Sequence, residues 1–358
     1  ARFAEPYTLQ VEMPGTVREV KAAKFIIATG TRATAPESEG AKAVFTCDEV
    51  LKLKEVPKTL TVIGGGVIGI EYASMFAALG VRVTLVENRE EILPFIDEEI
   101  VQALLYHLRE MDVAIRLGES VDRWEQDRAG RVHTFLKSGK QIVTDRVLYC
   151  VGREGATADL NLPAIGLKTD SRGRIEVNEK YQTDVSHVYA AGDVIGFPSL
   201  ASTSMEQGRL AACHALGIKA TSKPEFFPYG IYAIPEISMV GKTEQELTAA
   251  AVPYEAGKAH YREIARGQIL GYHNGTVKML FHQKTRQLLG VHIIGEGASE
   301  LIHIGQTALA FGATVDYFVN TVFNYPTLAE AYKVASFDAA NRMATLGDAE
   351  ARLQVIAA

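Results

Sequence analysis

Residues 59–89 read TLTVIGGGVIGIEYASMFAALGVRVTLVENR. Residues 60–63 form a short apolar run, residues 69–79 carry apolar side chains at helical spacing, and residues 81–86 form a second run rich in valine. Two β-branched runs on either side of a helix predict a parallel βαβ unit. The chain is therefore expected to have an α/β fold.

The glycines of this segment match the pattern Gly-x-Gly-x-x-Gly between a strand and a helix. Gly64 permits a tight turn, Gly66 lets the backbone approach a pyrophosphate, and Gly69 allows close packing of helix on strand. Glu87 follows the second strand, where a carboxylate can bind a ribose 2′-hydroxyl. The alternative is a purely structural glycine turn, but the strand, helix and acidic residue together favour a dinucleotide site.

The choice of dinucleotide stays open. Glu87 favours NAD because its carboxylate repels a 2′-phosphate, whereas Arg89 is able to pair with that phosphate and admit NADP. Arg89 is equally explained as a solvated loop residue. The sequence is therefore compatible with the use of both cofactors.

Composition narrows the class of protein. The chain has 358 residues with a net charge of −6, enough for two or three domains and unfavourable for binding nucleic acid. No apolar run is long enough for a membrane span, and residues 1–6 do not begin a signal peptide. Cys47, Cys150 and Cys213 are odd in number and far apart, which predicts a reducing cytoplasm. No spacing of His, Cys, Asp or Glu indicates a metal site.

The rest of the chain divides at Pro224 into two regions with different patterns of predicted strands and helices. Before Pro224, strands and helices alternate. After it, longer strands with a turn signal at Asn274-Gly275 predict an antiparallel sheet, and Thr243-x-x-Glu246 predicts a capping box. The predicted strands are 8–12, 18–29, 113–117, 131–137, 141–151, 188–191, 230–240, 254–261, 275–281 and 287–295. One predicted helix begins near Asp97, and three others cover about 199–216, 298–311 and 327–343.

Three further segments form a set with the fingerprint. They are Ala28-Thr29-Gly30, Thr183, and Val188-Tyr189-Ala190-Ala191-Gly192-Asp193. The set resembles the pyridine nucleotide–disulfide oxidoreductase family. That resemblance implies that Thr29, Gly30, Gly192 and Asp193 line an FAD site, with Asp193 bound to the ribityl chain. Outside this set, a Gly-Asp pair is simply a turn.

The resemblance also suggests roles for neighbouring residues. The helix that begins at Ser199, Leu200 and Ala201 is expected to point its positive N-terminus at the flavin. Glu71 is expected to pair with a flavin-side lysine, or else to be a surface carboxylate of the helix. The other residues assigned to the cofactors by resemblance are Val67, Ile68 and Gly152.

The resemblance predicts Rossmann-like FAD- and NAD(P)-binding domains followed by a C-terminal α+β dimerisation domain. Residues 234–241 and 323–330 carry the likeness to the dimerisation domain. The expected order is a partial FAD domain, an NAD(P) domain, the second part of the FAD domain, the dimerisation domain and a tail, with the boundaries 1–45, 46–165, 166–225, 226–345 and 346–358. The family's first glycine fingerprint and its Cys-x-x-x-x-Cys helix are missing, so the chain is expected to start partway through the FAD domain and to hold FAD poorly alone.

One departure from the family pattern bears on the reaction. Disulfide-reducing members have His-Pro where this chain has Tyr325-Pro326, and a glutamate, here Glu330, orients that histidine. A tyrosine, with an ordinary pKa of about 10, is poorly suited to that acid–base role. The surrounding residues resemble soluble pyridine nucleotide transhydrogenases, which implies hydride transfer from NADPH to NAD⁺ through FAD in a homodimer. A lipoamide dehydrogenase-like reductase and a non-catalytic dimerising remnant remain alternatives, and Tyr325 is also explained as a packing aromatic.

Overall fold

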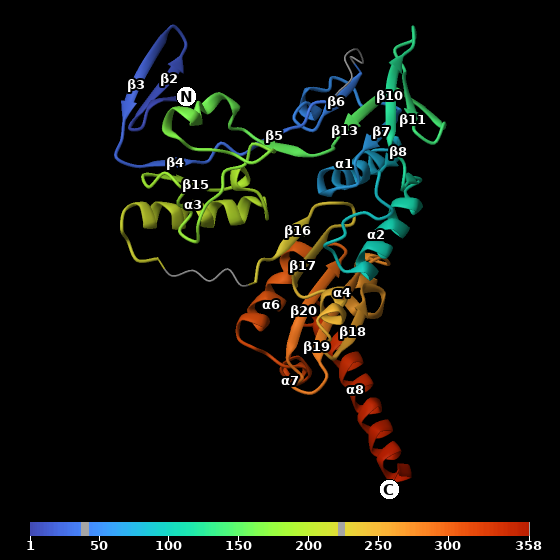
Figure 1. The fold of residues 1–358 in the computed structure, drawn as a ribbon. Coiled ribbons are helices and arrows are strands. Elements are labelled where there is room, and N and C mark those ends of the chain that lie inside the picture. Colours follow the sequence, from blue (N-terminus) through green and yellow to red (C-terminus); the bar gives the residue numbers. More distant parts are fainter. Residues whose placement is uncertain (37–42, 221–225, 358) are drawn as a thin grey trace. The chain divides into compact units, whose positions relative to one another are not determined.

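The computed structural model describes residues 1–36, 43–220 and 226–357 (Figure 1). These residues pack as two units. The first comprises the described residues of Ala1–Glu37, Thr46–Lys52 and Val151–Pro224, and the second those of Ser38–Phe45, Leu53–Cys150 and Glu225–Ala358. Each unit therefore combines segments that are distant in the sequence.

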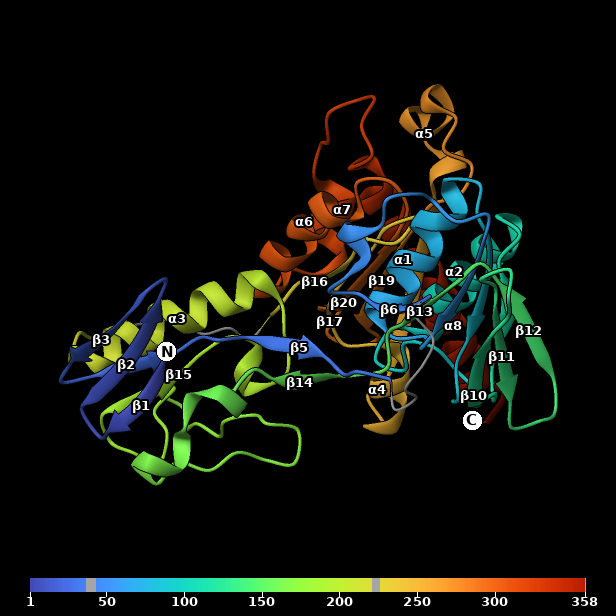
Figure 2. The same cartoon turned by 90° about the horizontal axis from the view of Figure 1, so that it is seen from above.

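The first unit is organised around a parallel pair of strands. β4 (Phe25–Ile27) runs beside β15 (Val188–Ala190) (Figure 1). α3 (Ala201–Ala215) packs against both strands, and Figure 2 shows it beside β15. The buried side chains of Phe25, Ile27 and Val188 belong to its hydrophobic core. Its other strands are the antiparallel β1 (Arg2–Glu5), β2 (Thr8–Met13) and β3 (Thr16–Lys21), and the pair β5 (Thr31–Ala33) and β14 (Arg153–Gly155). Its short 3-10 helices are η1 (Val50–Lys52), η2 (Ala158–Leu160), η3 (Leu162–Ile165) and η4 (Asp193–Ile195).

The second unit begins with the predicted βαβ unit, which is confirmed. Its sheet has the order β6 (Val44–Thr46), β13 (Arg146–Tyr149), β7 (Thr59–Ile63), β8 (Arg82–Val86) and β9 (Ala114–Arg116), with the last four strands parallel. α1 (Val67–Ala78) connects β7 to β8, and α2 (Glu98–Glu110) precedes β9. The carboxyl ends of β7 and β8 consequently lie side by side.

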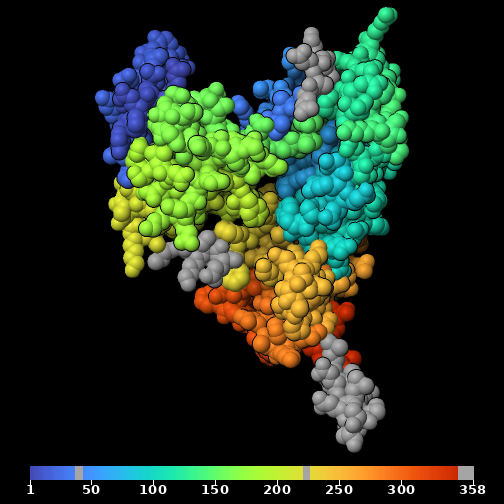
Figure 3. Space-filling view, viewed as in Figure 1, coloured from blue at the N-terminus to red at the C-terminus, as the bar shows by residue number. Residues whose placement is uncertain are grey.

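A small antiparallel sheet is joined to this layer. It consists of β10 (Val121–Gln126), β11 (Val132–Leu136) and β12 (Gln141–Thr144), and its hairpin projects at the surface of the unit (Figure 3). The buried side chains of Val132 and Leu136 share a core cluster with Ile63 and Val86. The small sheet therefore buries one face against the parallel sheet.

The remainder of the second unit is a five-stranded antiparallel sheet with helices, which confirms the predicted α+β character. The strand order is β16 (Tyr229–Ile231), β17 (Ile237–Gly241), β20 (Leu288–Ile294), β19 (Thr276–His282) and β18 (Tyr254–His260). The helices are α4 (Glu244–Ala249), η5 (Tyr261–Glu263), α5 (Ala265–Leu270), α6 (Ala298–Ala310), α7 (Val315–Asn320) and α8 (Glu330–Ala357). α6 packs on β17 and β20, whereas α8 packs on β18 and β19. The predicted capping box at Thr243 and Glu246 is present at the start of α4.

Three predicted strands were wrong in extent, because each is interrupted. Segment 18–29 divides into the exposed β3 and the partly buried β4. Segment 141–151 breaks at Asp145, whose carboxylate accepts hydrogen bonds from the backbone N–H groups of Lys58 and Thr59. Segment 230–240 breaks because the backbone N–H groups of Tyr232 and Ile234 bind side chains of α1 instead of a neighbouring strand.

Other differences concern elements that the sequence did not reveal. β1, β10, α5 and α7 were missed because they are short or lack a clear apolar period. α8 continues to Ala357, so residues 346–357, expected to be a tail, are helical. Residues 151–165 group with the first unit rather than with the nucleotide domain, although the functional domain boundaries stay predictions. None of the described helices combines the length and apolar character that crossing a membrane requires.

Candidate functional site

The glycine turn between β7 and α1 has the geometry that the fingerprint requires. Gly64 has φ +105°, which other residues rarely adopt. A Cβ on Gly69 would lie 1.8 Å from the carbonyl oxygen of Gly64, so helix and turn touch there. A Cβ on Gly66 would meet nothing within 4 Å, which leaves its outer face open to a ligand.

The first turn of α1 offers hydrogen-bond donors to an anion. Its N-cap is Gly66, with extended backbone and no side-chain cap. Val67 and Ile68, the first two helical residues, are half-buried. Free N–H groups and the positive end of the helix dipole attract negative charge. The turn therefore fits a pyrophosphate, as the sequence predicted for these residues.

The carboxylate of Glu87 lies beside this turn and is almost completely buried, with 4% of the residue exposed. Its Oε2 accepts a hydrogen bond from the backbone N–H of Gly65 at 2.6 Å. A Cβ on Gly65 would lie 3.0 Å from the same oxygen, which explains a glycine between the two fingerprint positions. Sequence reasoning assigned no role to Gly65, although a third consecutive glycine was a visible signal.

Arg89 binds the same carboxylate with both backbone and side chain. Its backbone N–H and Nε donate to Oε1 of Glu87 at 2.9 and 3.0 Å, and its Nη2 donates to Oε2 at 3.0 Å. Burial raises the pKa of Glu87, but the hydrogen bonds from Arg89 and Gly65 outweigh burial, so its pKa lies below the ordinary value. Glu87 is consequently a carboxylate at neutral pH, and Arg89 is not merely a solvated loop residue.

Glu71 lies one turn into α1 and contacts another part of the same unit. Its Oε1 accepts a hydrogen bond from the backbone N–H of Tyr232 at 2.9 Å, and nearby Ser74 accepts one from Ile234 at 3.0 Å. Burial raises the pKa of Glu71, although the bond from Tyr232 opposes this. Glu71 therefore joins α1 to the segment between β16 and β17, a contact that the sequence did not predict.

The residues assigned to FAD gather at the ends of β4 and β15. Because these strands are parallel neighbours, Thr29 and Gly30 follow β4 on the same side on which Gly192 and Asp193 follow β15. Gly192 has φ +80°, and its N–H donates to Oε1 of Gln207 at 2.8 Å. The structure thus brings together four residues that the sequence separates by more than 150 positions.

The start of α3 also belongs to this part of the first unit. The helix begins at Ala201 with Leu200 as its N-cap, which supplies no side-chain cap. Ser199 has φ +53°, and its hydroxyl donates to the carbonyl of Gly196. An uncapped helix N-terminus beside the Gly192 turn fits a partner that carries negative charge. Gly152, assigned to a cofactor by resemblance, lies in the same unit with φ +81° and an exposed surface.

Tyr325 and Glu330 line one hollow of about 300 Å³ in the second unit, together with Lys333 and Phe337. Tyr325 is 73% exposed. Oε2 of Glu330 is buried without a hydrogen-bond partner among the described residues. The structure therefore places the two residues together but shows no hydrogen bond through which this Oε2 would orient Tyr325.

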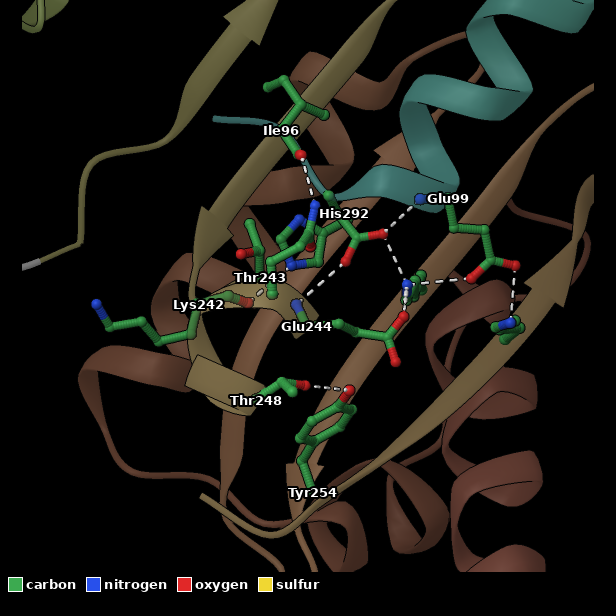
Figure 4. A network of polar contacts seen from close by, with 12 residues as sticks. Ile96, Glu99, Lys242, Thr243, Glu244, Thr248, Tyr254 and His292 are labelled. Atoms are coloured by element: carbon green, nitrogen blue, oxygen red, sulfur yellow. Dashed lines mark hydrogen bonds and ion pairs between the residues drawn. The ribbon is translucent and has the colours of Figure 1, made fainter. Parts of the chain in front are cut away.

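A polar network near α2 was missed by sequence reasoning (Figure 4). The ammonium of Lys278 donates to Oδ1 of Asp97 at 2.7 Å and also contacts Glu99 and Glu244. The neighbouring His292 donates from Nε2 to the carbonyl of Lys242, while its Nδ1 has no partner among the described residues. Lys278 stands within a run of apolar residues in β19, and such an isolated lysine was one sequence signal for this network.

Comparison with known proteins places this geometry in a family. Residues 4–208 match the model described as pyridine nucleotide-disulphide oxidoreductase, and residues 227–336 match the dimerisation domain of the same family. The chain belongs to the pyridine nucleotide-disulphide oxidoreductase family. The resemblance and the fold class inferred from the sequence are therefore confirmed.

Individual relatives agree with this assignment. The chain is 50% identical to the soluble pyridine nucleotide transhydrogenase of Mycobacterium bovis strain BCG / Pasteur 1173P2 over 349 residues, covering 96% of this chain and 74% of the relative. It is 46% identical over 352 residues to the soluble pyridine nucleotide transhydrogenase of Colwellia psychrerythraea, covering 96% and 75%. Among solved structures, the HOCl-induced flavoprotein disulfide reductase RclA of Escherichia coli is 27% identical with a TM-score of 0.88, covering 94% and 77%. The flavin and pyridine nucleotide cofactors predicted from the sequence are the ones expected of this family.

Proposed function

We propose that this protein transfers hydride from NADPH to NAD⁺ through bound FAD, as a soluble pyridine nucleotide transhydrogenase. The observation that carries the proposal is the 50% identity over 96% of the chain to a relative of that name. Tyr325 supports it, because a transhydrogenase needs no acid–base group for a dithiol. The alternatives of a lipoamide dehydrogenase-like reductase and a non-catalytic remnant are tested by the experiment below.

In this proposal, the second unit binds the nicotinamide dinucleotide. Gly64, Gly66 and Gly69 form the turn under the pyrophosphate, and the first turn of α1 donates N–H groups to it. Val67 and Ile68 begin that turn, and we propose that they lie near the nicotinamide ring of the bound dinucleotide. Because NADPH and NAD⁺ share this turn, the two substrates bind in succession.

The first unit holds the flavin. Thr29, Gly30, Gly192 and Asp193 line it at the ends of β4 and β15, and Gly152 completes the cofactor-binding set. FAD, when bound, accepts hydride from one nicotinamide and returns it to another. The uncapped start of α3, at Ser199, Leu200 and Ala201, stabilises negative charge on its partner.

Three residues predicted as catalytic receive separate proposals. We propose that Tyr325 packs in its hollow rather than transferring a proton, and that Glu330 shapes the same hollow. Glu71 is proposed to act by holding α1 through a hydrogen bond from the backbone N–H of Tyr232.

The assembly is proposed to be a homodimer in the cytoplasm. A match to the family's dimerisation domain over residues 227–336 supports the dimer. Three widely separated cysteines, with no disulfide among the described residues, support a reducing compartment.

The decisive experiment mixes the full-length protein, loaded with FAD, with NADPH and thio-NAD⁺ and follows the absorbance of thio-NADH. Rapid thio-NADH formation without any disulfide substrate is the expected result. No transfer, together with fast NADH oxidation by lipoamide, would assign the chain to the disulfide reductases instead. Failure of both reactions in a protein with stoichiometric FAD would favour a non-catalytic role.

A further inference from the structure

The two nucleotides of the proposed reaction differ by one phosphate on the adenosine ribose, so the site must accept both a 2′-hydroxyl and a 2′-phosphate. These groups make opposite demands. A hydroxyl donates to a carboxylate, whereas a phosphate is repelled by a carboxylate and attracted by a guanidinium. Both groups are present here, at Glu87 and Arg89, and they are bound to each other.

The carboxylate of Glu87 has no free acceptor position in this arrangement. A carboxylate has about four lone-pair sites. Two donors reach Oε1 of Glu87, from the backbone N–H and Nε of Arg89, and two reach Oε2, from Nη2 of Arg89 and the N–H of Gly65. A ribose hydroxyl therefore has to displace the guanidinium before it donates to Glu87.

The two side chains differ in freedom of movement. The side chain of Glu87 is 5% exposed and is held by Gly65, whereas that of Arg89 is 45% exposed. The backbone of Arg89 is anchored, because its carbonyl accepts a hydrogen bond from Gly118 at 2.9 Å and its N–H binds Glu87. Only the arginine side chain is therefore able to move, and it moves about a fixed Cα at the edge of the site.

Resting on the proposed function, we propose that Arg89 is a movable selector that lets one site accept both dinucleotides. With NAD⁺ or NADH, the guanidinium leaves Glu87, whose carboxylate accepts the 2′-hydroxyl. With NADP⁺ or NADPH, the guanidinium turns outward and pairs bidentately with the 2′-phosphate, and Glu87 keeps the bonds from Gly65 and from the backbone of Arg89. Either nucleotide opens the same ion pair, so that cost does not favour one over the other.

The selector predicts effects of opposite sign for the two nucleotides. Arg89→Ala removes the partner of the 2′-phosphate and also removes the competitor of the 2′-hydroxyl. Binding of a 2′-phosphorylated nucleotide should therefore weaken at least tenfold, while binding of its unphosphorylated counterpart should stay unchanged or tighten severalfold. A purely structural role for the ion pair would weaken both nucleotides equally.

The test is isothermal titration of FAD-loaded protein with adenosine 2′,5′-bisphosphate and with 5′-AMP. These probes carry no nicotinamide, so the result does not depend on hydride transfer. If the wild-type protein does not reduce thio-NAD⁺, the proposed function is wrong. The titrations with the two probes test only the selector. Equal weakening of both probes by Arg89→Ala, or no change in either, would overturn the selector.

Two further variants complete the test. Arg123→Ala is the matched control, because Arg123 forms a surface ion pair with Asp122 and Glu125 on β10 and should alter neither titration. Arg89→Lys keeps the charge but not the bidentate geometry, so it should give a smaller loss for adenosine 2′,5′-bisphosphate than Arg89→Ala. If the thermal melting of Arg89→Lys is unchanged, the variant folds normally. A loss of affinity for adenosine 2′,5′-bisphosphate as large as that of Arg89→Ala would then mean that the positive charge plays no part in binding the 2′-phosphate.

Discussion

Glu87 and Asp97 lie ten residues apart, and each carboxylate is buried and bound to a basic side chain. They differ in the exposure of that partner: Arg89 is 45% exposed, whereas Lys278 is fully buried. An exposed partner can be replaced by a ligand, because water and counter-ions compensate the displaced charge. A buried partner cannot leave without stranding a charge away from water. The same kind of ion pair therefore allows a ligand to replace the basic partner at Glu87, whereas at Asp97 it stabilises the fold.

The structural role of Asp97 follows from what it joins. It is the N-cap of α2, accepting from the backbone N–H of Glu99, and it also binds Lys278 of β19. Burial raises the pKa of Asp97, but His292 and Lys278 outweigh burial, so its pKa is lowered. This carboxylate consequently joins α2 to β19 of the antiparallel sheet in the second unit.

The largest expected effect comes from removing the buried cation. Lys278→Met leaves Asp97 and Glu244 close together without their partner, and breaking a buried ion pair costs about 3–5 kcal/mol. Denaturant unfolding measures the loss. Lys258→Met, which removes a half-buried partner of Glu99, should cost at most about 1 kcal/mol. Equal losses in the two variants would show that burial does not distinguish the networks.

Two glycine variants separate stability from binding beside Glu87. Gly69→Ala places a Cβ 1.8 Å from the carbonyl oxygen of Gly64 and should destabilise the unit by about 1–3 kcal/mol. Gly66→Ala meets no protein atom within 4 Å, so stability should change by less than about 1 kcal/mol. Thermal melting and NADH titration test the pair. If Gly66→Ala leaves affinity for NADH unchanged, the pyrophosphate does not lie over this turn.

His292 makes the buried network sensitive to acid. Burial lowers its pKa below the ordinary 6.5, even though Asp97 and the carbonyl of Lys242 favour the charged form. As the pH falls, the unfolded chain therefore binds a proton at His292 before the folded chain does. The contribution of the neutral His292 to the free energy of unfolding is fully present above pH 6.5 and is lost as the pH falls below that value. The slope contributed by one such group is at most about 1.4 kcal/mol per pH unit.

The check is the pH dependence of unfolding between pH 7 and 5 in the wild type and in His292→Gln. The variant keeps a donor for the carbonyl of Lys242 but does not titrate. Its stability should fall less steeply with acid, and identical slopes would show that His292 does not contribute.

The smallest expected effect concerns Glu71. Glu71→Gln keeps an acceptor for the backbone N–H of Tyr232, so stability should change by less than about 0.5 kcal/mol, whereas Glu71→Ala should cost about 1 kcal/mol. Because burial raises the pKa of Glu71, its negative charge does not stabilise the folded state. A large loss in Glu71→Gln, measured by thermal melting, would reveal that the charge itself is needed.

Much of the fold was predictable because its signals are local. The glycine pattern, the β-branched runs and the capping box at Thr243 act over a few residues, and each appears where it was expected. The interrupted strands were mispredicted because distant groups cause the breaks, such as Glu71 and Ser74 binding the chain near residue 233. The candidate site shows the same difference. The sequence predicted the glycine turn from Gly64 to Gly69 and the position of Glu87, but it did not predict the hydrogen bonds of Glu87 to Gly65 and Arg89.

The sequence by itself determined the family, the nucleotide turn and the identity of the carboxylate beside it. A positive φ at Gly64 and the contact that a Cβ on Gly69 would make with the carbonyl oxygen of Gly64 restrict these two positions to glycine. Only the tertiary structure decided which polar groups meet: the ammonium of Lys278 reaches Asp97 across 181 residues, and the backbone N–H of Tyr232 reaches Glu71 across 161. Such pairs depend on the packing of whole elements, because Coulomb and hydrogen-bond energies depend on the distance between the groups and on their burial. A local sequence pattern contains neither of these quantities.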